Sequence, residues 1–154
     1  YDVSNSLRFN AGDSPYLGRT PGSAGTSVQT WTFSCWAKRS TLSGSQVIFG
    51  ASNGDASQFV DITINGNNVF ELDILDSNST RTIRTTTAIF RDPTAWYHFV
   101  IVVDTTQGTA ANRLKLYVNG DEIATVAGTG TFPAQNANTQ VNGKVLLTDI
   151  MAVI

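Results

Sequence analysis

The feature that most constrains the fold of this chain is the segment 96–104, Trp-Tyr-His-Phe-Val-Ile-Val-Val-Asp. All of its residues except His98 and Asp104 are aromatic or β-branched, which favours an extended strand. Because successive side chains of a strand point to opposite faces, this segment is apolar on both faces. Strands of this kind lie inside a sheet that is covered on both sides. We therefore predict that segment 96–104 is a central strand buried between two layers.

The segment that follows has the pattern of a β-hairpin. Apolar and more polar side chains alternate over residues 113–118, and the pair Asn119-Gly120 comes directly after them. Asn-Gly is the pair that most readily adopts positive φ at both central positions of a type I′ turn. We therefore predict a half-buried hairpin, with Ile123 and Val126 returning on its second arm.

The rest of the chain consists of short extended segments separated by turn sequences rich in Gly, Ser, Thr and Asn. Residues 30–39 alternate between apolar and mostly polar side chains, which is the period of a strand with one buried face. We expect a helical turn only at residues 91–95. Strands at this spacing, with turns between them, are typical of an antiparallel sandwich. The predicted strands lie within residues 6–10, 16–19, 30–39, 46–50, 59–64, 69–75, 82–89, 96–104, 114–118 and 144–154.

The chain length bounds the number of domains. A chain of 154 residues is long enough to bury a core without disulfides or metals but too short for two ordinary domains, so we assign residues 1–154 to one domain. The sequence starts at Tyr1 rather than Met and stops at Ile154 inside an apolar run. We therefore expect it to be a processed or excised piece of a longer protein, with an incomplete last strand.

Charge and composition argue against several partners. The formal net charge is −2, and charged residues make up 14% of the chain, below the ~25% of ordinary soluble domains. Nucleic-acid binding needs many Lys and Arg side chains to neutralise phosphates, so we expect no nucleic acid. No apolar run approaches the ~20 residues of a membrane-spanning helix. Weak net charge does little to prevent pairing through sandwich edges, so we expect a symmetric oligomer.

Several short motifs resemble those of one family. Segments 31–36 (Trp-Thr-Phe-Ser-Cys-Trp), 95–98 (Ala-Trp-Tyr-His) and 114–120 (Leu-Lys-Leu-Tyr-Val-Asn-Gly) resemble the concanavalin A-like, laminin G-like jelly-roll domains. The run 90–98, Phe-Arg-Asp-Pro-Thr-Ala-Trp-Tyr-His, is similar to versions in structural proteins of tailed bacteriophages, notably marine ones. The resemblance begins at residue 4 and weakens past Ala134.

The resemblance implies an all-β, antiparallel two-sheet jelly-roll sandwich and a place in a virus particle, as a tail-fibre or capsid-decoration domain. Other virion proteins, further copies of the chain and a host-surface glycan are the implied partners. The fold alone does not fix an activity, because it carries lectins, glycanases and adhesion modules alike. We expect a non-enzymatic appendage domain with weak glycan recognition. The alternatives are a glycanase and a calcium-dependent laminin G-like adhesion domain.

The glycanase alternative depends on one strand. The spacing of Glu71, Asp73 and Asp76 resembles the Glu-x-Asp-x-x-Glu strand of the jelly-roll β-glucanases. Retaining hydrolysis needs two carboxyl groups about 5–5.5 Å apart. Strict alternation turns Asp76 to the face opposite Glu71 and Asp73, so the hypothesis needs a β-bulge. The simpler interpretation is an exposed acidic strand that ends in a turn.

Glycan recognition needs a different set of residues. Aromatic faces stack on sugar rings, and guanidinium groups donate paired hydrogen bonds to hydroxyl or carboxylate groups. Tryptophan in a sandwich more often belongs to the core, which is the competing interpretation. The candidate glycan-binding residues are Trp36, Arg39, Arg84, Arg91, Trp96 and Tyr117.

Metal and thiol chemistry have little support in the sequence. His98 is the only histidine, so we interpret it as a packed sheet residue, and Cys35 is the only cysteine, which we interpret as a small buried hydrophobe. No Asp-x-Asp-x-Asp-Gly calcium loop is present. We expect no cofactor, with calcium as the alternative. The carboxylates available for calcium are Asp13, Asp55, Asp92, Asp104 and Asp121.

Overall fold

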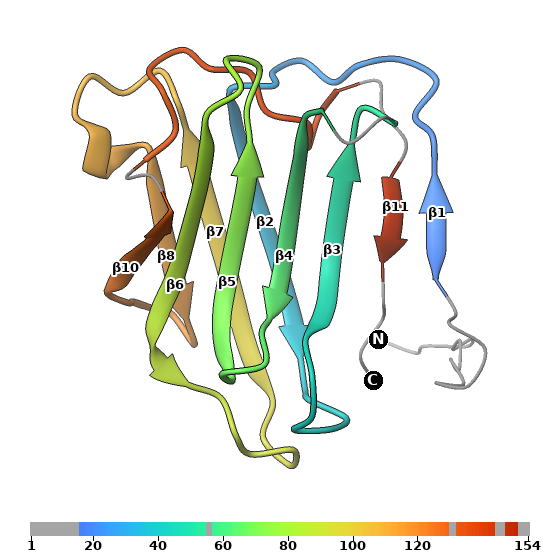
Figure 1. Ribbon diagram of the computed structural model, residues 1–154, viewed down its shortest axis with the longest axis vertical. Helices are drawn as coiled ribbons and strands as arrows, with labels where there is room; N and C mark the ends of the chain where they lie inside the picture. The colour runs from blue at the N-terminus through green and yellow to red at the C-terminus, as the bar shows by residue number, and fades with distance from the viewer. Residues whose placement is uncertain (1–15, 55–56, 130–131, 144–146, 151–154) are drawn as a thin grey trace.

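In the computed structural model the chain forms a sandwich of two antiparallel β-sheets (Figure 1). The structure describes residues 16–54, 57–129, 132–143 and 147–150. Each extended segment predicted within these residues contains a strand, and segment 6–10 lies outside them. The strands are β1 (Leu17–Arg19), β2 (Thr30–Ala37), β3 (Gln46–Ser52), β4 (Phe59–Ile64), β5 (Val69–Leu75), β6 (Arg81–Ile89), β7 (Tyr97–Asp104), β8 (Leu114–Val118), β9 (Asp121–Glu122), β10 (Thr125–Thr129) and β11 (Leu147–Ile150).

The strands divide between two layers. A five-stranded sheet has the order β10-β6-β5-β4-β3, and a four-stranded sheet has the order β2-β7-β8-β9. Strands β1 and β11 pair with each other and extend the architecture beyond β3 (Figure 1). The predicted all-β jelly-roll sandwich is confirmed.

Alternating apolar residues from both sheets form the core. On β7, Phe99 and Ile101 are 0% exposed, and Phe70 and Leu72 on β5 are also 0% exposed. Burying a side chain of this size stabilises the fold by about 1.5–3 kcal/mol. The facing rows of buried side chains therefore hold the two layers together.

Strand β7 is central in its sheet but is not buried on both faces. It pairs with β2 along its whole length and with β8 beyond Phe99, without a register shift. Its second face carries His98, Val100 and Val102, which are only half-buried. This face points away from the five-stranded sheet, and no described strand covers it. The prediction that both faces are sealed between layers is therefore wrong for the outer face.

The predicted type I′ turn is confirmed, but the second arm of its hairpin is shorter than expected. Asn119 has a φ of 54° and Gly120 a φ of 96°. Strand β9 ends at Glu122, and Ile123 returns on this arm as predicted, with its N–H donating to the Leu116 carbonyl at 2.9 Å. The chain then crosses to the five-stranded sheet. There Val126 pairs with Thr85 of β6 and is 50% exposed. The expectation that Val126 returns on the hairpin is therefore wrong.

Two further local features differ from the sequence pattern. A register shift between Val47 and Phe49 interrupts the pairing of β3 with β4, and the consecutive residues Ile48 and Phe49 both pack against the core. Phe49 contacts Phe33 at a ring-centroid distance of 5.0 Å. The expected helical turn at residues 91–95 is not helical. Among the described residues a 3₁₀ turn instead spans Ala110–Asn112. Within the described part of the chain, no helix has the length and apolar character that crossing a bilayer requires.

Candidate functional site

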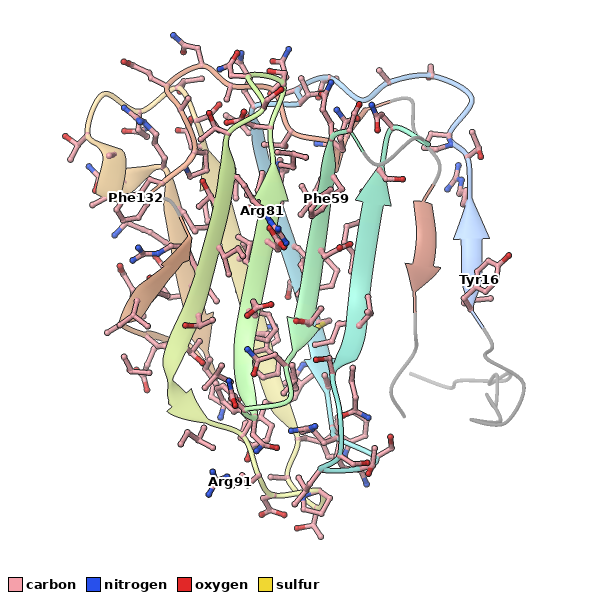
Figure 2. The ribbon with its side chains drawn as sticks, viewed as in Figure 1. Tyr16, Phe59, Arg81, Arg91 and Phe132 are labelled. Carbon is pink, nitrogen blue, oxygen red and sulfur yellow. The ribbon has the colours of Figure 1, made fainter. Side chains whose placement is uncertain are left out.

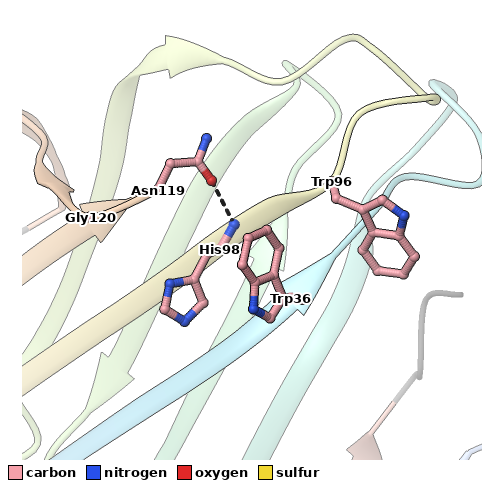
Figure 3. A pocket seen from close by; sticks show the side chains of 5 residues that line it. All are labelled: Trp36, Trp96, His98, Asn119 and Gly120. Carbon is pink, nitrogen blue, oxygen red and sulfur yellow. Dashed lines mark hydrogen bonds between the residues drawn. The ribbon is translucent and has the colours of Figure 1, made fainter. Parts of the chain in front are cut away.

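An open pocket lies at one end of the four-stranded sheet, where β2 ends, β7 begins and the β8–β9 turn reverses the chain (Figure 3). These segments meet because β2, β7 and β8 are antiparallel neighbours. The pocket has a volume of about 420 Å³. The described residues that line it are Trp36, Trp96, His98, Asn119 and Gly120.

Two indole rings supply the apolar part of the pocket. Trp31 and Ala37 of β2 face the core, so strand alternation turns Trp36 outward. Trp36 is 63% exposed, and Trp96, which immediately precedes β7, is 48% exposed. Two exposed indoles in one pocket lie outside the core, and exposed apolar surface of this kind is typical of binding surfaces.

His98 supports Trp36. The two residues are directly opposite in the β2–β7 ladder, and their rings stack with centroids 5.0 Å apart and planes 21° apart. Ser34 Oγ lies 2.8 Å from His98 Nε2, so that ring nitrogen is committed to a hydrogen bond within the sheet. Among the described residues His98 Nδ1 has no partner, so it remains accessible to a ligand.

Asn119 joins the β8–β9 turn to β7. The backbone N–H of His98 donates to Asn119 Oδ1 at 2.9 Å, shown as a dashed line in Figure 3, and the backbone N–H of Asn119 donates to the His98 carbonyl at 2.8 Å. Because an N–H group needs an oxygen acceptor, this contact fixes the orientation of the Asn119 amide. Its Nδ2 group bonds to none of the described residues, so two N–H donors of a lining residue are left without a described partner.

Lys38 adds a cation at the margin of the pocket. Its Nζ lies 5.6 Å from the centre of the Trp96 ring. A cation–π contact of this kind stabilises by about 0.5–1 kcal/mol at an exposed site. None of the described lining residues carries a carboxylate. The pocket is therefore aromatic, rich in hydrogen-bond donors and free of negative charge along its described lining.

The structure does not bring all six predicted glycan-binding residues together. Arg39 is 1% exposed, and burial lowers the pKa of its guanidinium. The group donates to Gln46 Oε1 at 2.9 Å, to Asn68 Oδ1 at 2.5 Å and to the Gly44 carbonyl at 3.3 Å. The prediction of a surface role is therefore wrong for Arg39, which ties the end of β2 to β3 and the β4–β5 turn.

Arg84 is also buried. It lies on the inner face of β6 and is 8% exposed, and burial lowers the pKa of its guanidinium. The group donates to the carbonyl and hydroxyl oxygens of Thr125 at 3.0 and 2.8 Å and lies 4.5 Å from the centre of the Phe132 ring. The prediction of a surface role is wrong here too, because Arg84 anchors β10 from inside the sandwich.

Arg91 and Tyr117 are accessible but lie outside the described lining of the pocket. Arg91 is exposed in the loop between β6 and β7 (Figure 2). Tyr117 is half-buried on the outer face of the four-stranded sheet, where it pairs with Val100. Of the six candidates, only Trp36 and Trp96 share the pocket.

The three carboxylates of the glycanase hypothesis do not converge. Asp73 pairs with Arg81, at 2.6 Å, on the outer face of the five-stranded sheet, and this contact raises the pKa of the guanidinium. Glu71 shares that face, since alternate residues of a strand do. Asp76 is 0% exposed and lies on the opposite side, where its Oδ1 accepts the backbone N–H groups of Asn78 and Thr80 at 2.9 and 3.0 Å. The structure contains no bulge that turns Asp76 back to Glu71.

Of the three described carboxylates that were considered for calcium, Asp92 and Asp104 accept local hydrogen bonds and Asp121 is exposed on β9. Asp92 Oδ1 accepts from the N–H and hydroxyl of Thr94, which lowers the pKa of that carboxyl. Asp104 accepts from Thr106 and Gln107 in the same way, with the same direction of pKa shift. Asp13 and Asp55 lie outside the described residues. Among those residues no group of three or more His, Cys, Asp or Glu side chains is placed to hold a metal ion.

Residues 10–145 match the family described as the concanavalin A-like lectin/glucanases superfamily. The chain belongs to this superfamily. The match includes the described residues that line the pocket. Superfamily membership fixes the jelly-roll fold but does not select among the activities that the fold carries. No curated protein matches the sequence.

Solved structures share the fold at low sequence identity. The CBM40 domain of Ruminococcus gnavus IT-sialidase bound to α2,3-sialyllactose has a TM-score of 0.53 and 13% identity over 79% of this chain and 64% of that one. The same domain bound to α2,6-sialyllactose has a TM-score of 0.51 and 13% identity over 90% of this chain and 93% of that one. Domains LG4-5 of the mouse laminin α1 chain have a TM-score of 0.56 and 11% identity over 86% of this chain and 31% of that one.

Four residues of the site were not among the sequence-based candidates. His98 was interpreted as a packed sheet residue and Asn119-Gly120 as turn residues only, and Lys38 was not considered. The alternation of β7 could have placed His98 on the outer face of the sheet, because His98 and Phe99 are adjacent and point to opposite faces. Its position opposite Trp36 depends on the pairing of β2 with β7, which local sequence does not specify.

Proposed function

We propose that this member of the concanavalin A-like superfamily is a glycan-binding module, with a sugar ring stacked on the exposed indoles of Trp36 and Trp96. The observation that carries the proposal is the open pocket in which these rings meet the donors of Asn119. Aromatic contacts contribute about 0.5–1.5 kcal/mol beyond the area they bury, and polar groups fix the orientation of a ligand. The sialyllactose complexes of the CBM40 domain support the choice of a glycan.

We propose binding without hydrolysis. Glu71 and Asp73 lie on the outer face of the five-stranded sheet, and Asp76 is buried on the other side of β5. Retaining glycosidases need two carboxyl groups about 5–5.5 Å apart around the scissile bond, and no described lining residue of the pocket is a carboxylate. Incubation with β-glucans should release no product. Hydrolysis that is lost in Glu71→Gln would contradict this part of the proposal.

A glycan array tests binding. The wild-type chain should bind a defined subset of glycans, and Trp36→Ala and Trp96→Ala should each weaken that binding at least about tenfold, equivalent to 1.4 kcal/mol. Tyr16→Ala is the matched control, because Tyr16 is 59% exposed but lies outside the pocket (Figure 2). Binding should survive a chelator, since we propose no metal. A blank array for the wild-type chain, or equal loss in Tyr16→Ala, would refute the proposal.

We further propose that the module is part of a tailed-bacteriophage particle, as a tail-fibre or capsid-decoration domain that recognises the host surface. This setting is supported by the similarity of residues 90–98 to phage structural proteins. The loop formed by these residues carries Trp96 into the pocket. Antibody labelling of purified particles tests the setting independently of glycan binding. Label on the tail or capsid surface is expected, and unlabelled particles would remove the virion role and leave the binding role.

A further inference from the structure

Resting on the glycan-binding role proposed above, we infer that the ligand of the pocket is an acidic saccharide, one that presents a carboxylate or sulfate group to Asn119 and Lys38. The inference comes from the balance of donors and acceptors in the pocket, which suits a ligand group that only accepts hydrogen bonds.

The side-chain groups left for a ligand are mainly donors. Asn119 Oδ1 is already occupied by the His98 backbone N–H, so this side chain offers only the N–H groups of Nδ2. Lys38 Nζ carries donors and no acceptor. His98 Nδ1 donates or accepts according to the tautomer, and donates when the ring is charged. Among the described side chains in and beside the pocket, donors therefore outnumber acceptors.

A neutral sugar suits this arrangement poorly. Each hydroxyl group of a neutral sugar donates as well as accepts, so a site that binds it through several hydroxyls needs acceptors for their protons, and the described side chains of this pocket offer few. Carboxylate and sulfate oxygens only accept, and hydrogen bonds to charged groups contribute about 1.5–3 kcal/mol, more than neutral ones. The donor-rich lining therefore favours an acidic group beside the stacked ring.

Local charge agrees with this assignment although the whole chain has a formal charge of −2. Glu122, near the hairpin turn, is bound by Lys115 Nζ at 2.9 and 3.1 Å. Asp121 follows Gly120 but is not among the described lining residues. Lys38 Nζ lies over the Trp96 ring, 5.6 Å from its centre, which places a cation beside the aromatic part of the pocket. An anionic substituent there meets a cation and no lining carboxylate.

The first experiment uses paired glycans. Carboxylated oligosaccharides are compared with their carboxyl-reduced forms, and sulfated oligosaccharides with their desulfated forms, in titrations with the wild-type chain. We expect the acidic member of at least one pair to bind roughly tenfold more tightly, with a gap that shrinks at high salt because screening weakens charge attraction. The pair that responds identifies carboxylate or sulfate. Equal binding of both members overturns the inference but leaves the proposed function, whereas no binding of any glycan overturns both.

The second experiment changes the charge of the pocket without changing its shape. Asn119→Asp keeps an oxygen acceptor for the His98 N–H and a residue type that tolerates a φ of 54°, but replaces the donors with an anion. Asn136→Asp is the matched control, since Asn136 is exposed with a φ of 59° and bonds to Thr105, at the end of β7 remote from His98. Asn119→Asp should lose at least tenfold in affinity for the acidic glycan while melting like the control. Unchanged affinity would overturn the inference.

Discussion

The rings of Phe70 and Phe99 lie face to face across the interior of the sandwich, with centroids 4.2 Å apart and planes 5° apart. Phe70 comes from β5 in the five-stranded sheet and Phe99 from β7 in the four-stranded sheet, and both are 0% exposed. Phe90 packs edge-on against Phe99 at 5.1 Å. The Phe70–Phe99 contact therefore joins the two sheets through β7, and the same strand directs His98 outward to the pocket.

Phe99→Ala should destabilise the fold strongly. Removing a buried ring costs the transfer free energy of its atoms and leaves a cavity, and such substitutions lower the free energy of unfolding by about 3–5 kcal/mol. Val100→Ala, on the half-buried outer face of the same strand, should cost about 1 kcal/mol or less. Urea denaturation measures both values. Equal costs would contradict the placement of the two faces.

Arg39→Met tests the buried arginine. The substitution leaves Gln46 Oε1, Asn68 Oδ1 and the Gly44 carbonyl without their donor. Of the three acceptor residues Gln46 is buried, Asn68 half-buried and Gly44 exposed. Leaving a buried acceptor unpaired costs about 1–3 kcal/mol, so we expect the free energy of unfolding to fall by about 2 kcal/mol. Arg91→Met, at an exposed loop position, should stay within about 0.5 kcal/mol of the wild type. A similar small effect in both variants would show that Arg39 is not a structural anchor.

Asp76 should matter for stability through its turn. Asp76→Ala removes the acceptor of the Asn78 and Thr80 N–H groups, and we expect a loss of about 2 kcal/mol in the free energy of unfolding. Asp76→Asn keeps one acceptor oxygen and should cost less than the alanine variant. Thermal and urea unfolding provide the comparison. The account of the turn fails if the alanine variant is as stable as the wild type.

Cys35 should react slowly in the folded protein. Burial raises the pKa of its thiol to about 11, so the thiolate that attacks thiol reagents is scarce at pH 8. Because the folded-state pKa lies above the unfolded value of 9.0, the thiol favours the folded state below pH 9, and this contribution is lost as the pH rises through 11. A chromogenic disulfide reagent should label Cys35 slowly without urea and rapidly with it. Equal rates in both conditions would contradict its burial.

The strands were predictable because their signal is local. The alternation of residues 30–37 separates the buried Trp31 from the exposed Trp36 without any knowledge of neighbouring strands. The Asn119-Gly120 pair likewise specifies its own turn through positive φ.

The candidate site was only partly predictable because it depends on contacts distant in sequence. Arg39 and Arg84 carry charge and were expected at the surface, but Asn68 and Thr125 provide acceptors that allow each of them to be buried. No local pattern places Trp36 opposite His98, because the register between β2 and β7 results from the whole sheet. The aromatic candidates were found, and the polar residues that complete their pocket were not.

Indole N–H signals in a glycan titration followed by NMR test the central claim most directly, because the three tryptophans of the chain include an internal control. The indole N–H of Trp31 is buried and donates to Thr139 Oγ1 at 2.7 Å. If a glycan stacks in the pocket, the Trp36 and Trp96 signals shift in a saturable manner while the Trp31 signal stays in place. Saturable binding that leaves the Trp36 and Trp96 signals unmoved would contradict the account.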